Sequence, residues 1–410
     1  MKKLSSSGAI LLAMILGIGA GAIMGESASI FAPLGDIFLK LITMLIIPLV
    51  FFSIISGAAS LGKTKSAGKV GVLTLGYYLL TSAISVLIGI GAGLLFKPGL
   101  GITVPSSLLT DASTYSEAGK VAGFWETVKG IIPSNPFESL ITGNILQILV
   151  FSLFFGICLS TLDEKKQKPL LEVLDTINET LIKMVGKILL FAPFGVFGLM
   201  ANSIAIFGID ILALVFKLFA VFALALSIIH FGMIPSLVAA FTDIGAFRFI
   251  KTLLPAQILA FSTASSMATL PVNKKCCEEL GVDNTTSSFI LPLGATVNMN
   301  GNAMLYGLTT MFFAQMFSVD ISISQYVAII LTSVLGAVGT AGVPGPSLLV
   351  VAVLSAAGVP VVALPLVFGI DRIMDMMRTS TNILGDASCA VIMDRLIKKE
   401  NKQSISESVA

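Results

Sequence analysis

Long runs of apolar residues recur from one end of the chain to the other, separated by short polar or charged segments. Runs of about 18 to 20 residues or more are long enough to cross the hydrocarbon core of a bilayer as helices. Six such runs precede Arg248, at residues 8–25, 37–62, 70–96, 144–162, 170–206 and 209–241. Lipid offers no partner to backbone N–H and C=O groups, so each run is expected to be helical. The pattern therefore predicts an all-α polytopic membrane protein.

Two later apolar segments, 249–280 and 323–358, are interrupted in the middle by small, polar or proline residues. The interruptions read STASSMATLP at residues 262–271 and GTAGVPGPS at residues 339–347. If both segments crossed the membrane as kinked spans, Lys274 would lie outside, against the tendency of basic residues to stay inside. That tendency is kept if each segment enters and returns on its own side. We therefore expect eight transmembrane helices plus two opposed re-entrant hairpins, which is typical of secondary transporters with inverted repeats.

Charged residues are scarce, and their placement predicts the orientation of the chain. Of the 410 residues, 55% are hydrophobic and 12% charged, against about 25% charged residues in soluble domains. The positive-inside rule makes the side with the basic clusters cytoplasmic, so both termini lie inside the cytoplasmic membrane and residues 97–143 form an external loop. The net charge of +2 gives no reason to expect nucleic acid as a partner beside membrane lipid. The basic clusters on that side are residues 2–3, 63–69, 165–168, 248–251 and 395–402.

The last span, about residues 361–397, carries five polar or charged residues at spacings of 4, 3, 4 and 4. At about 100° per residue they fall within an arc of roughly 80° and form one stripe. Each charge facing lipid would cost about 3 kcal/mol, so the stripe is expected to face protein, solute or water. A structural ion-pair network is one interpretation. In the other, the arginine holds a solute carboxylate and a bound cation offsets the excess negative charge. The five residues are Asp371, Asp375, Arg378, Asn382 and Asp386.

Polar residues also interrupt two earlier spans. Residues 294–303 read GATVNMNGNA, where glycines and amides favour local unwinding that frees carbonyl oxygens for a cation. A glycine hinge without a ligand role is the alternative. In the third span, Tyr78 and Ser82 share one face with Thr81 beside them. This second motif is weak by itself, because hydroxyl groups in helices commonly bond to their own backbone.

Taken in order along nearly the whole chain, these motifs resemble those of the dicarboxylate/amino acid:cation symporter family, the prokaryotic relatives of glutamate transporters. The resemblance implies a secondary active symporter of glutamate or aspartate, coupled to sodium and working by an elevator mechanism as a homotrimer. It implies no enzymatic activity. The five motifs are YLLTS at 78–82, the serine-rich run 262–271, NMNG at 298–301, GVPG at 342–345 and the stripe of the last span.

The resemblance also implies that each protomer divides into a scaffold and a moving transport part. The final transport segment would contain helix 6, hairpin 249–280, helix 7, hairpin 323–358 and helix 8. In chain order the parts are scaffold helices 1 and 2 (1–69), transport helix 3 (70–96), the external loop (97–143), scaffold helices 4 and 5 (144–208), the remaining transport part (209–400) and a cytoplasmic tail (401–410).

For the substrate, the resemblance implies a set of eight residues around an acidic amino acid. Arg378 would hold the side-chain carboxylate and Asp375 the amino group. Asn382 and the two serines of the first hairpin tip would hold the main-chain carboxylate. The set is Ser265, Ser266, Asn302, Val343, Asp375, Arg378, Thr379 and Asn382.

For sodium, the resemblance implies three sites built from oxygen atoms and one thioether. The first is Asp386 with carbonyl groups near Gly294, Asn298 and Asn382. The second and third are Thr296, Met299 and Thr340, and then Tyr78, Thr81, Ser82, Asn298 and Asn300.

The chain departs from the family pattern at three positions. Asn300 stands where the family usually has aspartate, so the third cation site lacks a negative charge and protons are an alternative coupling ion. Asn302 replaces a common threonine and Met267 a small residue, which changes the shape of the pocket. Because Asp375 is kept together with Arg378, we expect a zwitterion with an extra acid group. A C4-dicarboxylate or cystine carrier of the same fold is the alternative.

Other classes of protein fit the sequence less well. An intramembrane aspartyl protease would need its carboxylates on two helices and a Gly-x-Gly-Asp pattern, which the chain lacks. A serine hydrolase would need an acid partner for His230, the only histidine, which lies in an apolar span and is expected to be packed there. An ion channel would explain a polar interior but not a substrate-sized pair of arginine and aspartate.

Overall fold

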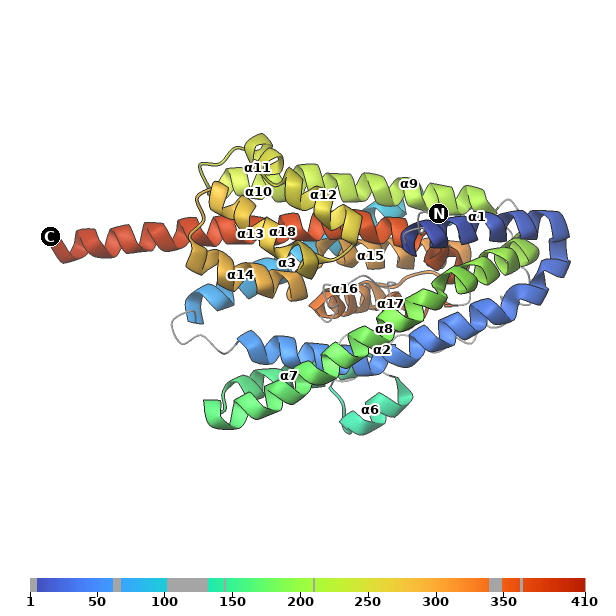
Figure 1. Cartoon of the computed structure of the whole chain (residues 1–410), viewed down its shortest axis with the longest axis horizontal. Coiled ribbons are helices and arrows are strands. Elements are labelled where there is room, and N and C mark those ends of the chain that lie inside the picture. The colour runs from blue at the N-terminus through green and yellow to red at the C-terminus, as the bar shows by residue number, and fades with distance from the viewer. Residues whose placement is uncertain are drawn as a thin grey trace, which may run out of the picture.

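The computed structural model describes residues 6–61, 68–101, 132–143, 145–208, 211–338, 349–361 and 364–409. Every regular element within these ranges is a helix, which confirms the all-α prediction. The helices pack into two groups, which we call the apolar group and the polar group (Figure 1).

The apolar group is centred on the long helix α8, which contacts α1, η1 and α2, while α7 packs against α2. Helix α8 bends by 53° between Glu164–Ile188 and Leu190–Ile206. Pro193 accounts for the bend, because proline cannot donate a hydrogen bond to the carbonyl group four residues earlier. The members are α1 (Ser6–Met24), the 3-10 helix η1 (Gly25–Phe31), α2 (Ala32–Leu61), α6 (Pro136–Thr142), α7 (Ile145–Ser160) and α8 (Glu164–Phe207).

The polar group is arranged around α18, which runs along the long axis of the molecule and contacts α9, α10, α12, α13, α14 and α15 (Figure 1). Among the described residues, every buried Asp and Arg lies on this helix. The members are α3 (Gly68–Phe96), α9 (Ile211–Ser227), the π-helix η2 (Ile228–Met233), α10 (Ile234–Phe241), α11 (Ala246–Thr252), α12 (Leu254–Thr263), α13 (Ser266–Glu279), α14 (Asn284–Val297), α15 (Asn300–Met316), α16 (Ile323–Val338), α17 (Leu349–Ala356) and α18 (Leu364–Val409).

Glycines allow helices to approach closely within each group. In the apolar group, a Cβ atom added to Gly17 of α1 would lie 2.5 Å from the carbonyl oxygen of Phe197 in α8. In the polar group, a Cβ atom at Gly307 of α15 would lie 2.8 Å from the carbonyl oxygen of Val86 in α3. Such backbone contacts leave no room for a side chain, so each group is tightly packed. The two groups meet mainly where α8 contacts α18.

Several helices have the dimensions of membrane spans. Within the described ranges, three helical stretches are long and apolar enough to cross a membrane, and the two segments of α8 would make a fourth if they form one span. This is fewer than the eight predicted, because within these ranges α7, α14 and α15 have 16, 14 and 17 residues and α18 carries charges along its length. The three stretches are Leu12–Phe38, Val70–Phe96 and Ile211–Phe241.

The first interrupted segment reverses direction sharply between two short helices that contact each other. Helix α12 ends at Ala264, whose φ of 51° and ψ of 37° are left-handed, and Ser265 then caps α13 by accepting a hydrogen bond from the backbone of Ala268. In the second interrupted segment, α16 and α17 also contact each other. The residues that join them, 339–348, lie outside the described ranges, so the predicted second tip cannot be compared.

Candidate functional site

The amide-rich run of residues 294–303 breaks a helix beside α18. Helix α14 ends at Val297, Asn298 is extended with φ −91° and ψ 97°, and Met299 has φ −123° and ψ 55° before α15 begins. Gly301 then passes so close to α18 that an added Cβ atom would lie 3.0 Å from the Cα atom of Arg378. The predicted unwinding is therefore present, and it brings polar backbone against the stripe.

Arg378 is completely buried and is held by two carboxylates of its own helix. Its Nη1 donates to Asp371 Oδ1 at 3.0 Å, and its Nη2 donates to Asp375 Oδ1 at 3.3 Å. The buried Nε has no hydrogen-bond partner among the described residues. On the other side of Asp375, Nη1 of Arg372 lies 3.6 Å from Oδ2. The stripe thus faces protein, as predicted.

Arg372 changes the count of charges. The stripe itself sets three carboxylates against Arg378 alone, but Arg372 also neutralises Asp375, so two aspartates face two arginines. The remaining carboxylate belongs to Asp386, which is 1% exposed. Within the described part of the chain no basic side chain lies in ion-pair range of it. The excess negative charge of the stripe is therefore concentrated at Asp386.

Amide and carbonyl groups surround Asp386. The Nδ2 of Asn298 donates to Asp386 Oδ1 at 2.8 Å and to the carbonyl oxygen of Asn382 at 3.1 Å. The Oδ1 of Asn298 is buried without a hydrogen-bond partner among the described residues. A Cβ atom at Gly294 would lie 2.6 Å from Asp386 Oδ1 and from the hydroxyl of Tyr78. The four residues of the first predicted cation site therefore meet in space.

The second predicted cation site is brought together only in part. The sulfur of Met299 accepts from Nδ2 of Asn382 at 3.2 Å, next to the first site. The hydroxyl of Thr296 instead donates to the carbonyl oxygen of Leu293 in its own helix at 2.9 Å. Thr340 lies outside the described residues.

The third predicted cation site joins α3 to the start of α15. Ser82 Oγ donates to Asn300 Oδ1 at 3.4 Å, while Nδ2 of the buried Asn300 has no partner in the described ranges. The hydroxyl of Tyr78 donates to the carbonyl oxygen of Ile290 at 3.2 Å. Thr81 bonds to the carbonyl oxygen of Tyr77 at 2.9 Å, which is the local back-bonding expected of a helical hydroxyl.

The predicted substrate residues on α18 and α15 take part in two sets of hydrogen bonds, one around Asn382 and one around Asp375. Asn382 Oδ1 accepts from the backbone N–H of Gly301 at 2.8 Å, and its Nδ2 lies 3.4 Å from Asn302 Oδ1. Thr379 is buried and donates to the carbonyl oxygen of Asp375 at 2.8 Å. Asp375 itself pairs with Arg378.

The serines of the first tip lie at the start of α13, where Ser265 Oγ accepts from the backbone N–H of Ala268 at 3.2 Å and Ser266 is 3% exposed. Both α12 and α13 contact α18. Val343, predicted on the second tip, lies outside the described residues.

Three contacts around the site were not predicted. Asp371 is the closer carboxylate partner of Arg378, although it was seen only as part of the stripe. Nδ2 of Asn273, on α13, donates to the carbonyl oxygen of Ile383 at 3.1 Å, and the hydroxyl of Tyr77 lies 2.7 Å from that of Ser388. Asn273 follows the serine-rich run and is 1% exposed, so a buried amide beside the motif was the available signal.

The chemistry of the donor set fits a hard cation. Around Asp386 the candidate ligands are carboxylate, amide and carbonyl oxygens, which is the set that such cations prefer. Among the described residues no cluster of three His, Cys, Asp or Glu side chains could hold a metal ion. A transition-metal centre therefore has no support here.

Comparison with known proteins gives consistent matches over nearly the full chain. The family model described as "Sodium:dicarboxylate symporter family" matches residues 7–396. The chain is 36% identical over 417 residues to the "Proton/sodium-glutamate symport protein" of Bacillus caldotenax, covering 100% of this chain and 99% of that protein. It is 32% identical over 406 residues to the "Proton/glutamate-aspartate symporter" of Escherichia coli (strain K12), covering 95% and 92%. It is 32% identical over 390 residues to the "C4-dicarboxylate transport protein" of Anaeromyxobacter sp. (strain K), covering 94% and 88%.

Proposed function

The chain belongs to the sodium:dicarboxylate symporter family, and from that membership we propose that it imports an acidic amino acid, glutamate or aspartate, together with cations, with sodium preferred. It is a multi-pass membrane transporter and not an enzyme. The names of its relatives include both amino acid and C4-dicarboxylate carriers and both sodium and proton coupling. The choice between these substrates and between these coupling ions therefore rests on the residues of the site.

The observation that carries the proposal is the pairing of Arg378 with Asp375. Their contact of 3.3 Å is longer than the 2.7 to 2.9 Å typical of charge-assisted hydrogen bonds. A zwitterionic substrate can replace both halves of this pair, because its carboxylate suits Arg378 and its ammonium group suits Asp375. Asp371 would stay on Nη1 of Arg378, and the unpartnered Nε would supply another N–H group. The carboxylate and ammonium group that replace the ion pair carry no net charge together, and the second carboxylate of the substrate is the one assigned to Asn382 and the hairpin serines.

A C4-dicarboxylate makes this exchange less favourable. It brings a carboxylate for Arg378 but no cation for Asp375, which would keep only Arg372 at 3.6 Å. A buried carboxylate that loses its partner is costly. We therefore place the C4-dicarboxylate, and cystine with it, as alternative substrates behind glutamate and aspartate.

For the coupling ion, the proposal rests on Asp386 and its neighbours. The amide N–H groups of Asn298 donate to Asp386 and to the carbonyl oxygen of Asn382. A cation in place of this amide nitrogen would lie between the same two oxygen atoms. Rotating this amide by half a turn would direct its unpartnered Oδ1 to the same point and make three oxygens converge there. That set suits sodium, with Gly294 leaving the space that a side chain would fill.

Proton coupling is the second candidate, because a proton could neutralise Asp386 instead. Asn300 brings no negative charge to the third predicted site, where Ser82 bonds to it. We propose sodium at the site around Asp386, with Met299 and Thr296 near a second ion, and a third site of lower affinity at Asn300.

The proposed mechanism is an elevator in a homotrimer, in which the polar group moves against the apolar group. The division agrees with the proposed scaffold at 1–69 and 144–208 and the proposed transport part at 70–96 and 209–400. Close glycine contacts such as those at Gly17 and Gly307 join helices within one group, which supports two rigid bodies. In this proposal the polar group includes two opposed re-entrant hairpins, α12 with α13 and α16 with α17, the chain has eight spans and both termini are cytoplasmic.

Uptake by proteoliposomes tests the proposal. Labelled aspartate is offered to vesicles under an imposed sodium gradient, and then under a pH gradient without sodium. We expect sodium-driven accumulation that external potassium does not support. Uptake that ignores sodium and follows the pH gradient would favour proton coupling. Competition by unlabelled glutamate, succinate and cystine ranks the substrates, and succinate competing better than glutamate would contradict the amino acid assignment.

A further inference from the structure

The only histidine of the chain lies in a widened turn of the helix that follows the apolar group. His230 is in the π-helix η2, Ile228–Met233, between α9 and α10. Pro235 follows directly and cannot donate to the carbonyl group of Phe231, which favours a local departure from α-helical bonding. Single π turns inside α-helices are frequently found at functional positions.

Both ring nitrogens of His230 bond to other helices. Nε2 lies 3.1 Å from Oε1 of Gln257 on α12, and Nδ1 lies 3.0 Å from the hydroxyl of Thr381 on α18. Because Nε2 of Gln257 donates to the carbonyl oxygen of Ile250 at 2.9 Å, its Oε1 is the atom that faces the ring. The proton of the neutral ring therefore belongs on Nε2, and Nδ1 accepts from Thr381.

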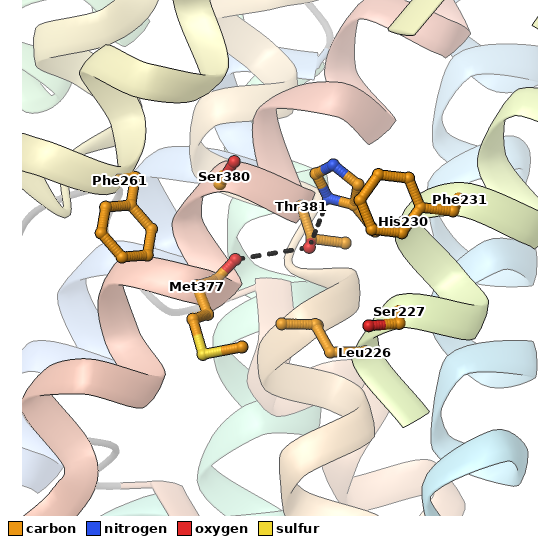
Figure 2. A pocket seen from close by; sticks show the side chains of 8 residues that line it. All are labelled: Leu226, Ser227, His230, Phe231, Phe261, Met377, Ser380 and Thr381. Atoms are coloured by element: carbon orange, nitrogen blue, oxygen red, sulfur yellow. Dashed lines mark hydrogen bonds between the residues drawn. The ribbon is translucent and has the colours of Figure 1, made fainter. Parts of the chain in front are cut away.

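The packing between α12 and α18 is incomplete beside this ring, although the two helices contact each other. A cavity of about 180 Å³ lies between α9, η2, α12 and α18, with Phe261 on one side and Met377 and Thr381 on another (Figure 2). Ser227, one of the polar residues of its lining, donates to the carbonyl oxygen of Ala223 at 2.7 Å. Where side chains do not interlock, directional hydrogen bonds have to set the spacing.

Of the two helices that His230 joins, α18 carries proposed substrate residues, and α12 leads into the tip whose two serines begin α13. Gln257 lies eight residues before Ser265 on α12, and Thr381 lies between Arg378 and Asn382 on α18. The other arm of the same hairpin, α13, is tied directly to α18 by Asn273 and the carbonyl oxygen of Ile383. The α12 arm also packs against α18, and the ring of His230 adds a hydrogen-bonded link between the two helices.

We infer that His230 is a positioning residue, which holds α12, the arm that leads into the serine-bearing tip, at a fixed distance from the substrate residues of α18. The inference rests on the proposed function, since it assigns a role toward that site. The ring nitrogens of His230 bond to Gln257 and Thr381, neither of which is a proposed substrate or cation residue, and His230 acts through these two residues. Its loss therefore weakens binding of the substrate while leaving the groups that contact substrate in place.

The test compares His230→Leu, Thr381→Val and the control Ser227→Ala in proteoliposome uptake of aspartate. His230→Leu removes both hydrogen bonds, and Thr381→Val removes one while preserving shape. A buried group left unpaired corresponds to about a tenfold change in affinity, so we expect the KM for aspartate to rise about tenfold with Vmax within about twofold. His230→Asn, which can still accept from Thr381, should have an intermediate KM. Ser227 lines the same cavity but bonds only to its own helix, so Ser227→Ala should leave KM unchanged.

A combined variant, His230→Leu with Thr381→Val, separates positioning from general damage. We expect its KM to match that of His230→Leu alone, because both changes break the same bridge. KM values of His230→Leu and Thr381→Val that stay within about twofold of the control would overturn the inference. A fall in Vmax at constant KM would do the same.

Hydrogen exchange keeps the two proposals distinguishable. In the purified protein, amides of Leu254–Thr263 should exchange faster in His230→Leu than in Ser227→Ala, whether or not aspartate is transported. If the unmodified protein transports no acidic substrate, the proposed function fails, and the exchange rates alone decide the role of His230. Equal exchange in the two variants would refute the bridge.

Discussion

Glycines allow close contacts between helices in both the apolar group and the polar group, but these contacts have different roles in the two groups. In the apolar group, Gly17 brings the backbone of one helix against another at Phe197. In the polar group, Gly294 makes room for Asp386 and Tyr78, and Gly301 passes against Arg378. Close glycine contacts thus stabilise one region and shape a site in the other.

Buried charge separates the groups more sharply. Every buried Asp and Arg of the described residues lies on α18. In the apolar group, Ser56 Oγ donates to Asp175 Oδ1 at 2.5 Å, and Asp175 is exposed to solvent. Burying a charge costs free energy unless the charge is paired, so a helical bundle with a purely structural role has no need of buried charges. We conclude that the charged residues of α18 carry the chemistry of the site and that the apolar group supports this helix.

The largest expected effect comes from removing the arginine of the site. Arg378→Gln removes the guanidinium that pairs with Asp371 and Asp375, and leaves Asp375 with Arg372 at 3.6 Å. Breaking a buried ion pair costs about 3 to 5 kcal/mol, so we expect uptake of aspartate, as Vmax/KM, to fall on the order of 100-fold or more. Arg378→Lys keeps the positive charge but loses the planar guanidinium group that donates to two carboxylates, so its uptake of aspartate should remain strongly impaired.

The matched change in the apolar group is Asp175→Asn, which alters an exposed carboxylate bonded to Ser56. Its uptake should stay within about twofold of the unmodified protein, because exposed polar pairs contribute about 1 kcal/mol or less. Thermal unfolding in detergent shows whether each variant is folded. Equal losses of uptake in Arg378→Gln and Asp175→Asn would break the comparison between the groups.

The next effect distinguishes substrates. In Asp375→Asn, the proposed partner of the substrate ammonium group loses its charge while Arg378 keeps Asp371 at 3.0 Å. We expect the KM for aspartate to rise about 10- to 30-fold, from the loss of a charged hydrogen bond of about 1.5 to 2 kcal/mol. Inhibition by succinate, which has no ammonium group, should stay constant or strengthen. A parallel loss for both compounds would count against a zwitterionic substrate.

A third experiment compares one glycine from each group. In Gly294→Ala, the new methyl group would lie 2.6 Å from Asp386 Oδ1, so the proposed cation site must deform. We expect the sodium concentration for half-maximal uptake to rise about tenfold, equivalent to about 1.4 kcal/mol, which is a typical cost of overpacking. Gly17→Ala meets the carbonyl oxygen of Phe197 at 2.5 Å. It should lower the melting temperature and leave the sodium dependence unchanged.

Much of this contrast could be predicted from the sequence. The stripe on α18 follows from helical periodicity alone. The run of amides and glycines predicted the break at Asn298 and Met299, because local unwinding depends on the residues of the run itself. The positions of the apolar runs likewise predicted the helices. Each of these inferences uses neighbours along the chain.

What could not be predicted depends on contacts between distant helices. Arg372 lies outside the stripe's arc, so its pairing with Asp375 required the side-chain positions. The link of His230 to Gln257 and Thr381 depends on a π-helical turn that shifts the register of one helix against two others. Periodicity predicts a face, but it does not predict which partner meets that face.

The smallest expected effect sharpens the comparison within α18 itself. Asp394 is 2% exposed, yet it lies beyond the site and bonds to Lys398 Nζ at 2.8 Å and to the backbone N–H of Asp283 at 3.0 Å. The hydrogen bond to Asp394 holds the pKa of Lys398 above its ordinary value, with help from Asp283. A raised lysine pKa means that the stabilisation is complete at neutral pH and is lost only as the pH rises through the alkaline range.

Lys398→Met removes this charge while keeping the length of the side chain. Because Lys398 is 35% exposed at its side chain, solvent weakens the pair, and we expect a loss of about 1 kcal/mol or less, seen as a melting temperature lower by roughly 2 °C. The KM for aspartate and the sodium dependence should not change, since the pair fastens the end of α18 to the turn before α14. A shift in the KM or in the sodium dependence would show that buried charge on α18 affects transport even outside the site. The distinction between site residues and supporting residues would then separate whole helices and could not be made within α18.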